Sequence, residues 1–305
     1  MERNIITIIG SYNVGFFFKG TSLPVLGETI IGKQFIEGGG GKGSNQAIAA
    51  ATFGADTRFI CTLGADKYGI DALRMYREKG INIDLIRLEP CIHSGMSVII
   101  IDDKGNNIIS VVPGANLLLN EQDIDHAEEL IKKSYIVGFQ LENRHETVFY
   151  GMKKTKSLGV KTFLDPAPAT KLPHELYPYI DIIKPNETEA SILTDLQVND
   201  IESATAAGKW FVSKGVKTAI ITLGHQGSVL VTNELTKHFS ALKVEAIDST
   251  GAGDIFSGGL LASLVKDKSM EESIKYATCA AGIATTRLGV IESIPSHEEV
   301  LKIMR

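Results

Sequence analysis

The stretch at 248–254 reads D-S-T-G-A-G-D, and it constrains the fold of this chain more than any other because an apolar segment follows it directly. Two glycines around an alanine, then an acid and an apolar run, predict the N-terminus of a buried helix. The first N–H groups of a helix have no intrahelical partner and carry partial positive charge, so such a turn binds anions. Glycine also lets the backbone approach an oxygen-rich group closely.

The acid in this stretch, Asp254, lies where a bound phosphate would place its own negative charge. Two adjacent negative groups are unfavourable unless a reaction needs both, and a base beside a phosphoryl group in transfer is such a case. The alternative is that Asp254 only complements the helix dipole and that the glycines form a tight turn.

The size and the net charge of the chain limit the classes of function to be considered. The chain has 305 residues, of which 44% are hydrophobic and 22% charged, enough for one large α/β domain or two small ones. A net charge of −5 argues against nucleic acid as a partner. No apolar stretch approaches the roughly 20 residues of a membrane span. The three cysteines fit buried thiols in a reducing cytosol, so we expect a cytoplasmic protein.

Strand and helix patterns alternate along most of the chain. Predicted strands at 5–9, 57–63, 83–88, 134–139, 160–164, 180–184 and 217–222 alternate with helices such as 44–53, 68–79, 121–133, 145–157 and 270–287. This order predicts an α/β fold with a central, mostly parallel sheet and helices on both faces. We expect a single domain over residues 1–305, with a hairpin in 94–113 that turns at 103–107.

Residues 10–15 are predicted to form a loop at the carboxyl end of the first strand, where open α/β sheets bind ligands. Asn13 in this loop is therefore a candidate ligand contact, although asparagine is also a common turn residue. The aromatic run Phe16-Phe17-Phe18 follows, and it indicates a flap or a partner interface.

A second glycine-rich stretch, 38–43, precedes the helix predicted at 44–53. It contains G-x-G-x-x-G, but no buried strand leads into it, so we reject a dinucleotide-binding turn. A phosphate-binding P-loop fails as well, because Lys42 is followed by Gly43 and not by serine or threonine. A flexible glycine loop is the structural alternative, but ordering its backbone would cost much conformational entropy without a compensating contact.

Together, D-S-T-G-A-G-D and the G-G-K-G-S-N-Q-A string at 40–47 resemble the signatures of the ribokinase-like (PfkB) carbohydrate kinases, and ribokinases match most closely. The resemblance implies a Rossmann-type sandwich with a small β-sheet lid from about 13–36 and 91–112. It also implies a homodimer paired through that lid. The implied reaction moves the γ-phosphoryl group of ATP to a primary hydroxyl of a sugar. Asp254 would be the base, and the amides of Gly251, Ala252 and Gly253 an anion hole.

The resemblance also assigns binding residues. Sugar contacts would be Asn13, Gly15, Gly40, Gly41, Lys42, Asn45, Glu142 and Asp254. Nucleotide contacts would be Asn186, Thr222, Gly224, Gly227, Gly253 and Thr278. Mg²⁺ would be held through water by Glu189, and K⁺ by Asp248, Thr250, Ala284, Arg287, Gly289 and Ser293.

Several of these residues have a purely structural alternative. Asn186 and Glu189 form a capping-box pattern, which is sufficient by itself to start a helix. Residues 222–227 would also suit a hairpin turn. Glu142 would also suit a solvated surface position, and we interpret Asp165 as part of a rigid turn.

One position of the sequence leaves the identity of the sugar substrate open. The first loop of ribokinases reads N-x-D, whereas this chain has Asn13-Val14-Gly15. Loss of a carboxylate acceptor costs about 1.5–3 kcal/mol per charged hydrogen bond, and Gly15 leaves space for a larger substituent. Ribose is the leading substrate; another pentose such as 2-deoxyribose, a ketohexose or a nucleoside are alternatives. A sugar-binding sensor without catalysis is the alternative from another class of protein.

Overall fold

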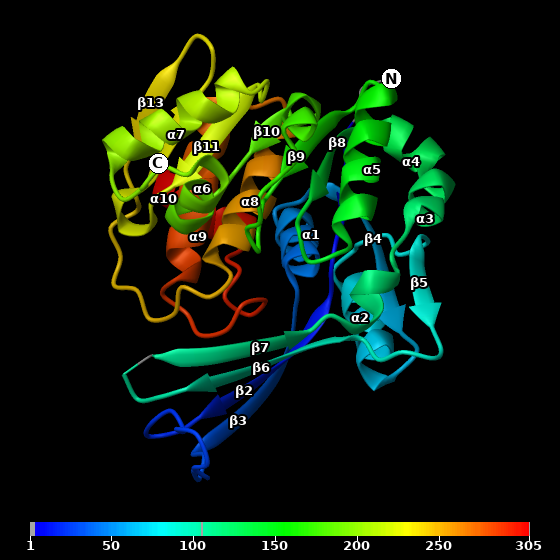
Figure 1. Ribbon diagram of the computed structural model, residues 1–305, viewed down its shortest axis with the longest axis vertical. Coiled ribbons are helices and arrows are strands. Elements are labelled where there is room, and N and C mark those ends of the chain that lie inside the picture. Colours follow the sequence, from blue (N-terminus) through cyan, green and yellow to red (C-terminus); the bar gives the residue numbers. More distant parts are fainter. Residues whose placement is uncertain (1–3, 105, 305) are drawn as a thin grey trace.

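The computed structural model describes residues 4–104 and 106–304 and contains two sheets (Figure 1). The larger has nine strands, parallel from β11 to β5 and antiparallel at the β12–β13 edge. In order across the sheet they are β13 (Thr236–Phe239), β12 (Ser228–Val231), β11 (Thr218–Thr222), β10 (Ile182–Ile183), β9 (Lys161–Leu164), β8 (Ser134–Phe139), β1 (Ile5–Ile9), β4 (Asp56–Gly64) and β5 (Ile86–Glu89).

Helices cover both faces of this sheet, as predicted. Because side chains alternate along a strand, Ile8 of β1 packs on one helical layer and Ile9 on the other. One layer comprises α1 (Lys42–Thr52), α2 (Lys67–Glu78), α8 (Ala252–Leu264) and α9 (Met270–Ala284), with α10 (His297–Met304) packed on α9. The other comprises α3 (Glu121–His126), α4 (Glu128–Lys133), α5 (His145–Ser157), α6 (Glu187–Thr194) and α7 (Ile201–Ser213).

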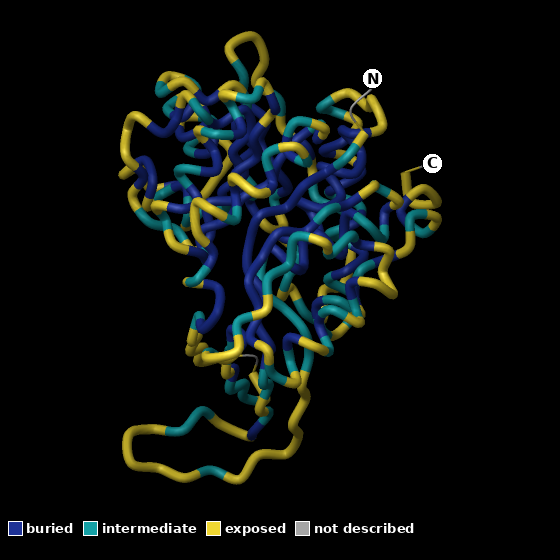
Figure 2. Tube along the Cα trace, turned by 90° about the vertical axis from the view of Figure 1, so that its right-hand side faces the viewer, coloured by how far each residue is buried: buried dark blue, intermediate teal, exposed yellow. Residues whose placement is uncertain are grey.

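The smaller sheet has four strands in the order β3-β2-β6-β7 and projects from the body (Figure 1). Its strands are β2 (Asn13–Lys19), β3 (Gln34–Gly40), β6 (Gly95–Ile101) and β7 (Asn107–Val112). We call it the lid sheet, because it comes from the two segments predicted to form a lid. Figure 2 shows buried residues concentrated in the body and exposed residues along the outer part of this sheet. Gly105, in the predicted hairpin turn, lies outside the described residues.

Several predicted boundaries are wrong. The strand expected at 180–184 is limited to Ile182–Ile183. The helix expected at 121–133 is interrupted at Ala127 and forms α3 and α4, from which Ile124 and Ile131 are both buried in the core. The strand expected at 83–88 begins at Ile86, because the Ile86 amide turns back to the Ile83 carbonyl. The helix expected to reach 287 ends at Ala284, after which i to i−3 hydrogen bonds tighten the chain.

Within the described residues, three short 3₁₀ helices connect these elements: η1 (Gly114–Leu118), η2 (His174–Tyr179) and η3 (Gly224–Gln226). Of the helices in the described part of the chain, none combines the length and the apolar character needed to cross a lipid bilayer.

Candidate active site

The candidate site lies at the carboxyl ends of β1, β8, β9 and β10. After β1 the chain adds β4 on one side of this strand, and it later adds β8, β9 and β10 on the other side. Such a reversal of strand order leaves a ligand-binding position at the carboxyl edge. Asn13, Glu142, Asp165 and Lys184 each follow one of these strands.

The glycine-rich stretch is built differently from the predicted loop. Residues 38–40 belong to β3, and α1 begins at Lys42 and not at Ser44. Gly41 caps α1 with φ 89°, and a Cβ there would lie 2.6 Å from the Asn13 amide nitrogen. Gly41 and Gly43 are therefore required, because the start of α1 packs directly on the chain that follows β1.

Glu142 is hydrogen-bonded to other residues that we predicted to bind the sugar. Its Oε2 accepts hydrogen bonds from the Lys42 amide at 2.9 Å, from Asn13 Nδ2 at 3.4 Å and from the Ser11 hydroxyl. Asn13 is the first residue of β2 and not part of a loop, and its Oδ1 accepts from Asn116 Nδ2 at 2.9 Å. Glu142 is thus tied into the site and is not a solvated surface acid.

Lys42 is a buried cation among acids. Burial lowers the pKa of its ammonium group, but the charges of Asp254, Asp165 and Glu142 outweigh burial and raise that pKa above its usual value. Lys42 therefore stays charged, and it contributes the positive potential that an oxygen-rich ligand needs here.

Asp254 lies in the first turn of α8 with 5% of its surface exposed. Its Oδ2 accepts from Asn45 Nδ2 at 2.8 Å and its Oδ1 from Gln46 Nε2 at 3.2 Å. The two glycine-rich stretches, some 200 residues apart in sequence, therefore meet at this carboxylate. Gln46 was not predicted from the sequence.

The turn before Asp254 presents free amides, but of the three that we predicted the amide of Ala252 is not free. The Ala252 amide donates to the Ser249 carbonyl at 3.2 Å and is already engaged. Within the described residues, the amides of Gly251, Gly253 and Asp254 have no hydrogen-bond partner. Gly251 has φ 75°, and a Cβ there would lie 2.4 Å from Val290 Cγ1.

The interpretation of Asp165 as a turn residue was incomplete. Its carboxylate is buried and accepts hydrogen bonds from Lys184, Gln46 and Ser257. A carboxylate before a proline gives no sign of this in the sequence, since its partners come from three other elements.

Asn186 and Glu189 form the predicted capping box at the start of α6. Glu189 N donates to Asn186 Oδ1 and Asn186 N donates to Glu189 Oε2, both at 2.8 Å. Burial, followed by the charge of Asp165, raises the pKa of the Glu189 carboxyl, and Lys184 opposes this rise. The capping role is therefore real, and the carboxyl also faces the charged interior of the site.

The predicted nucleotide contacts fall in two places. Thr222 ends β11 and bridges to Asn186, and its amide donates to the Pro185 carbonyl at 3.0 Å. Gly224 and Gly227 form the β11–β12 hairpin turn with positive φ, and a Cβ on Gly227 would lie 1.9 Å from the Phe239 carbonyl oxygen. Thr278 lies on α9 and is one of the residues that line a cavity of about 370 Å³. Its Oγ1 is buried and has no hydrogen-bond partner among the described residues.

The residues predicted to hold K⁺ come from neighbouring segments. Asp248 accepts from the amides of Thr250 at 2.9 Å and Gly289 at 3.2 Å, which joins the chain before α8 to the chain after α9. The Arg287 amide donates to the Ala284 carbonyl at 3.0 Å, while the Arg287 side chain pairs with Glu299. The Ser293 hydroxyl donates to the Val290 carbonyl at 2.8 Å.

A model of the family described as pfkB family carbohydrate kinase matches residues 5–297. The chain belongs to this family. It is an ATP-dependent carbohydrate kinase, in agreement with the fold and with the meeting of the two glycine-rich stretches at Asp254.

Relatives support a small sugar as the acceptor class. The chain is 37% identical over 302 residues to a ribokinase of Haemophilus influenzae, covering 99% of both chains. It is 34% identical over 295 residues to a deoxyribokinase of Salmonella typhi, covering 96% of both. The solved structure of Arabidopsis thaliana ribokinase complexed with ribose and ATP superposes with a TM-score of 0.92, at 32% identity over 98% of both chains.

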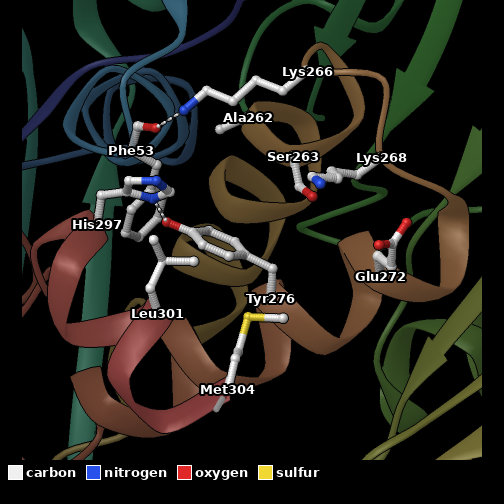
Figure 3. A pocket seen from close by; sticks show the side chains of 10 residues that line it. All are labelled: Phe53, Ala262, Ser263, Lys266, Lys268, Glu272, Tyr276, His297, Leu301 and Met304. Atoms are coloured by element: carbon white, nitrogen blue, oxygen red, sulfur yellow. Dashed lines mark hydrogen bonds between the residues drawn. The ribbon is translucent and has the colours of Figure 1, made fainter.

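A cavity of about 380 Å³ lies at the other end of α8 from Asp254, and no predicted site residue of this kinase lines it. Several of its polar groups are already paired, since Lys266 Nζ donates to the Phe53 carbonyl at 2.8 Å and the Tyr276 hydroxyl bonds His297 Nδ1 at 2.7 Å (Figure 3). These bonds connect the end of α1 to the chain after α8, and α9 to α10.

Gly15 does not leave the open space that we predicted. A Cβ on Gly15 would lie 2.7 Å from Phe17 Cε2, so an aromatic ring occupies this position. Asn13, Gly15 and Phe17 alternate onto one face of β2, the face from which Asn13 reaches Glu142. An apolar surface therefore stands where ribokinases carry an acid.

Proposed function

We propose that this kinase phosphorylates the primary hydroxyl of D-ribose with ATP to give ribose 5-phosphate. The observation that carries the proposal is the hydrogen bond from Asn45 Nδ2 to Asp254 Oδ2, at 2.8 Å. It joins the sugar-side glycine stretch to the start of α8, beside the free amides. The ribokinase relatives support the choice of ribose.

The sugar would lie over the start of α1. Asn13, Lys42, Asn45 and Glu142 offer donors and acceptors for ring hydroxyls, and the backbone at Gly15, Gly40 and Gly41 permits close approach. Because these groups are held by hydrogen bonds to one another, the primary hydroxyl would be directed to Asp254 with little freedom.

In the transfer step, the Asp254 carboxylate accepts the hydroxyl proton as the sugar oxygen bonds to the γ-phosphorus. The bond from that phosphorus to the β–γ bridging oxygen breaks, and its electrons leave with ADP. The amides of Gly251 and Gly253 donate to the charged phosphoryl oxygens from fixed positions, so no reorganisation is needed at that moment. Ala252 contributes the geometry of the turn.

We propose ATP contacts at Asn186, Thr222, Gly224, Gly227, Gly253 and Thr278. The Asn186–Thr222 bridge places two of these beside each other at the carboxyl edge of the sheet. Thr278 lines the cavity of about 370 Å³, and rotation of its unpartnered hydroxyl toward the cavity would offer a donor or an acceptor to a nucleotide.

The site's charges fit two cations. Glu189 is a partly buried carboxyl whose pKa is raised by burial and by Asp165, and a nearby cation would offset both effects. Through water, Glu189 would hold the Mg²⁺ that neutralises phosphate charge. Carboxylate and carbonyl oxygens of Asp248, Thr250, Ala284, Arg287, Gly289 and Ser293 would hold K⁺ near the start of α8.

A second acceptor, 2-deoxy-D-ribose, is favoured by the Phe17 ring over Gly15. An apolar surface cannot compensate the desolvation of a hydroxyl, so a sugar with one hydroxyl fewer loses less on binding there. The deoxyribokinase relative is consistent with this alternative.

We further propose a single kinase domain whose lid sheet pairs two subunits into a homodimer. Large apolar side chains of this sheet are exposed, among them Phe35 at 54%, Ile109 at 57% and Val112 at 51%. Such a patch marks an interaction surface, and pairing would protect it from water.

A cytoplasmic location fits the three unpaired cysteines.

The test is ADP release over a panel of D-ribose, 2-deoxy-D-ribose, D-fructose and adenosine. We expect the highest kcat/KM with D-ribose and the next highest with 2-deoxy-D-ribose. A higher value for fructose or adenosine would overturn the pentose assignment. Measurable ribose binding without turnover of any acceptor would favour a sensor over an enzyme.

A further inference from the structure

A buried ion pair lies beside the site, and the sugar and nucleotide assignments leave it without a role. Lys184 Nζ is 2.8 Å from Asp165 Oδ2, and the two side chains are 4% and 2% exposed. Lys184 follows β10 and Asp165 follows β9, so the pair spans the carboxyl ends of adjacent strands. Burying two charges is expensive, and the pair alone is weak evidence for stability.

The pair contacts both structures that hold Asp254. Lys184 Nζ also donates to the Gly253 carbonyl at 3.2 Å, in the first turn of α8. The Ser257 hydroxyl lies between Asp165 Oδ2, at 3.1 Å, and the same Gly253 carbonyl, at 2.9 Å. The backbone next to the base is therefore fixed to the pair from two sides.

The second connection runs through Gln46. Its Nε2 lies 2.9 Å from Asp165 Oδ2 and 3.2 Å from Asp254 Oδ1, so one amide group bridges two carboxylates. Gln140 Nε2 donates to Gln46 Oε1 at 2.7 Å, which fixes the amide with its nitrogen toward the acids. The carboxylates of Asp165 and Asp254 are thereby joined through a single amide group.

We propose that Asp165 and Lys184 form a positioning pair for Asp254, in which the lysine offsets the Asp165 charge beside the base and both hold the first turn of α8. The proposal rests on the role of Asp254 proposed above. Lys42 of α1 also interacts with Asp254, and Glu142 after β8 and Glu189 of α6 are further charged groups near Lys42. With Lys184 removed, Lys42 would be the one cation among these named groups.

Neutral replacement of the whole pair fits the surroundings. Asp165 Oδ1 is buried without a hydrogen-bond partner among the described residues, so an asparagine could keep its oxygen toward Gln46 and Ser257. Methionine has nearly the length of lysine and no charge. A pair with both charges removed therefore preserves shape, whereas either single change leaves one buried charge alone.

The chain supplies a matched control at the other end of β10. Asp181 is 5% exposed and accepts hydrogen bonds from Lys156 Nζ at 2.8 and 2.9 Å, immediately before the strand. It contacts no residue of the site among its described partners. Asp181→Asn therefore breaks a buried Asp–Lys pair of similar kind without touching Asp254.

The experiment compares Asp165→Asn, Lys184→Met, the double variant and Asp181→Asn in the ADP-release assay across pH. Each single site variant should lose about 100-fold in kcat with sugar KM within about twofold. Lys184→Met leaves the Asp165 charge beside the base, so the acid limb of kcat/KM moves to higher pH. Asp165→Asn leaves a cation there, so the limb moves to lower pH.

The double variant should recover at least tenfold over the weaker single variant, with its acid limb at the wild-type position. It also keeps the test valid if a single variant fails to fold, because it buries no unpaired charge. A double variant that is no more active than the single variants would overturn the proposal. So would Asp165→Asn and Lys184→Met variants whose acid limb of kcat/KM does not shift, which is the result expected of Asp181→Asn. If Asp254→Asn keeps normal turnover, the assignment of the base fails instead.

Discussion

The transferring end of the site and the lid sheet are built in opposite ways. Every residue of α8 from Asp254 to Leu264 is buried. The packing leaves no room for one added atom at Gly251, where a Cβ would lie 2.4 Å from Val290 Cγ1. Every residue of β7 in the lid is exposed, and the first four residues of β3 are exposed as well. Close packing fixes the groups that perform the chemistry.

The lid is held mainly by pairing between neighbouring strands, so its side chains are free to vary. Asn13 and Gly15 sit at the junction, where β2 leaves the body and its burial falls along the strand. The difference teaches that a close-packed core can fix the groups that we propose for phosphotransfer, whereas the acceptor choice and subunit pairing that we propose would depend on a surface that tolerates substitution.

The largest effect is expected in the body, from Gly251→Ala. The left-handed backbone costs about 1–2 kcal/mol for alanine, and the methyl group would meet Val290. A displaced turn should lower kcat about 100-fold. Gly80→Ala is the control, since Gly80 has φ 72° with nothing within 4 Å of a Cβ. Equal activity of the two variants would show that the turn is not critical.

At the junction, Gly15→Asp should change the choice of sugar. A carboxylate on this face would accept from ring hydroxyls, so we expect the ratio of kcat/KM for ribose over 2-deoxyribose to rise about tenfold or more. The Phe17 ring must turn aside, and it is the far end of a flexible side chain. An unchanged ratio would mean that this face does not meet the sugar.

On the outer lid, Ile109→Lys should weaken pairing of subunits without changing the fold. Burying an isoleucine is worth about 1.5–3 kcal/mol, and a symmetric interface contains each substitution twice. Sedimentation should show a shift toward monomer, whereas Ile303→Lys on α10, 51% exposed against 57% for Ile109, should not. A wild-type monomer at working concentration would contradict the dimer.

The smallest effect on turnover is expected from Asp181→Asn, which should act on stability alone. Burial raises the pKa of the Asp181 carboxyl, but hydrogen bonds from Lys156 and Lys217 outweigh burial and lower that pKa overall. Its stabilising contribution is therefore present above the unfolded-state pKa and is lost as pH falls through the folded-state value. Denaturant unfolding should show a loss of about 1–3 kcal/mol at pH 7 that shrinks in acid.

Sequence reasoning located the parts of the site that are local in the chain. The capping box at Asn186 and the glycine turn at 251–253 have short-range signatures, and the structure contains both. The layered sheet followed from strand and helix patterns, because a buried parallel strand such as β1 is apolar at nearly every position.

What the sequence could not predict depends on distant partners. The partners of Asp165 are Gln46, Lys184 and Ser257, which lie 119, 19 and 92 residues away. The interruption at Ala127 involves no glycine or proline, so no local signal marks it. The filling of the space at Gly15 depends on the rotamer of Phe17, which a sequence pattern does not contain.

The central claim is that Asp254, held by Asn45 and Gln46 beside free amides, is the base of phosphoryl transfer. The most direct measurement is the single-turnover rate of Asp254→Asn with ribose and ATP, alongside ribose affinity by calorimetry. Asp267→Asn, in the turn after α8, is the control. We predict a rate about 10²–10⁴-fold lower with affinity within a few fold. A near-normal rate for Asp254→Asn would contradict the claim.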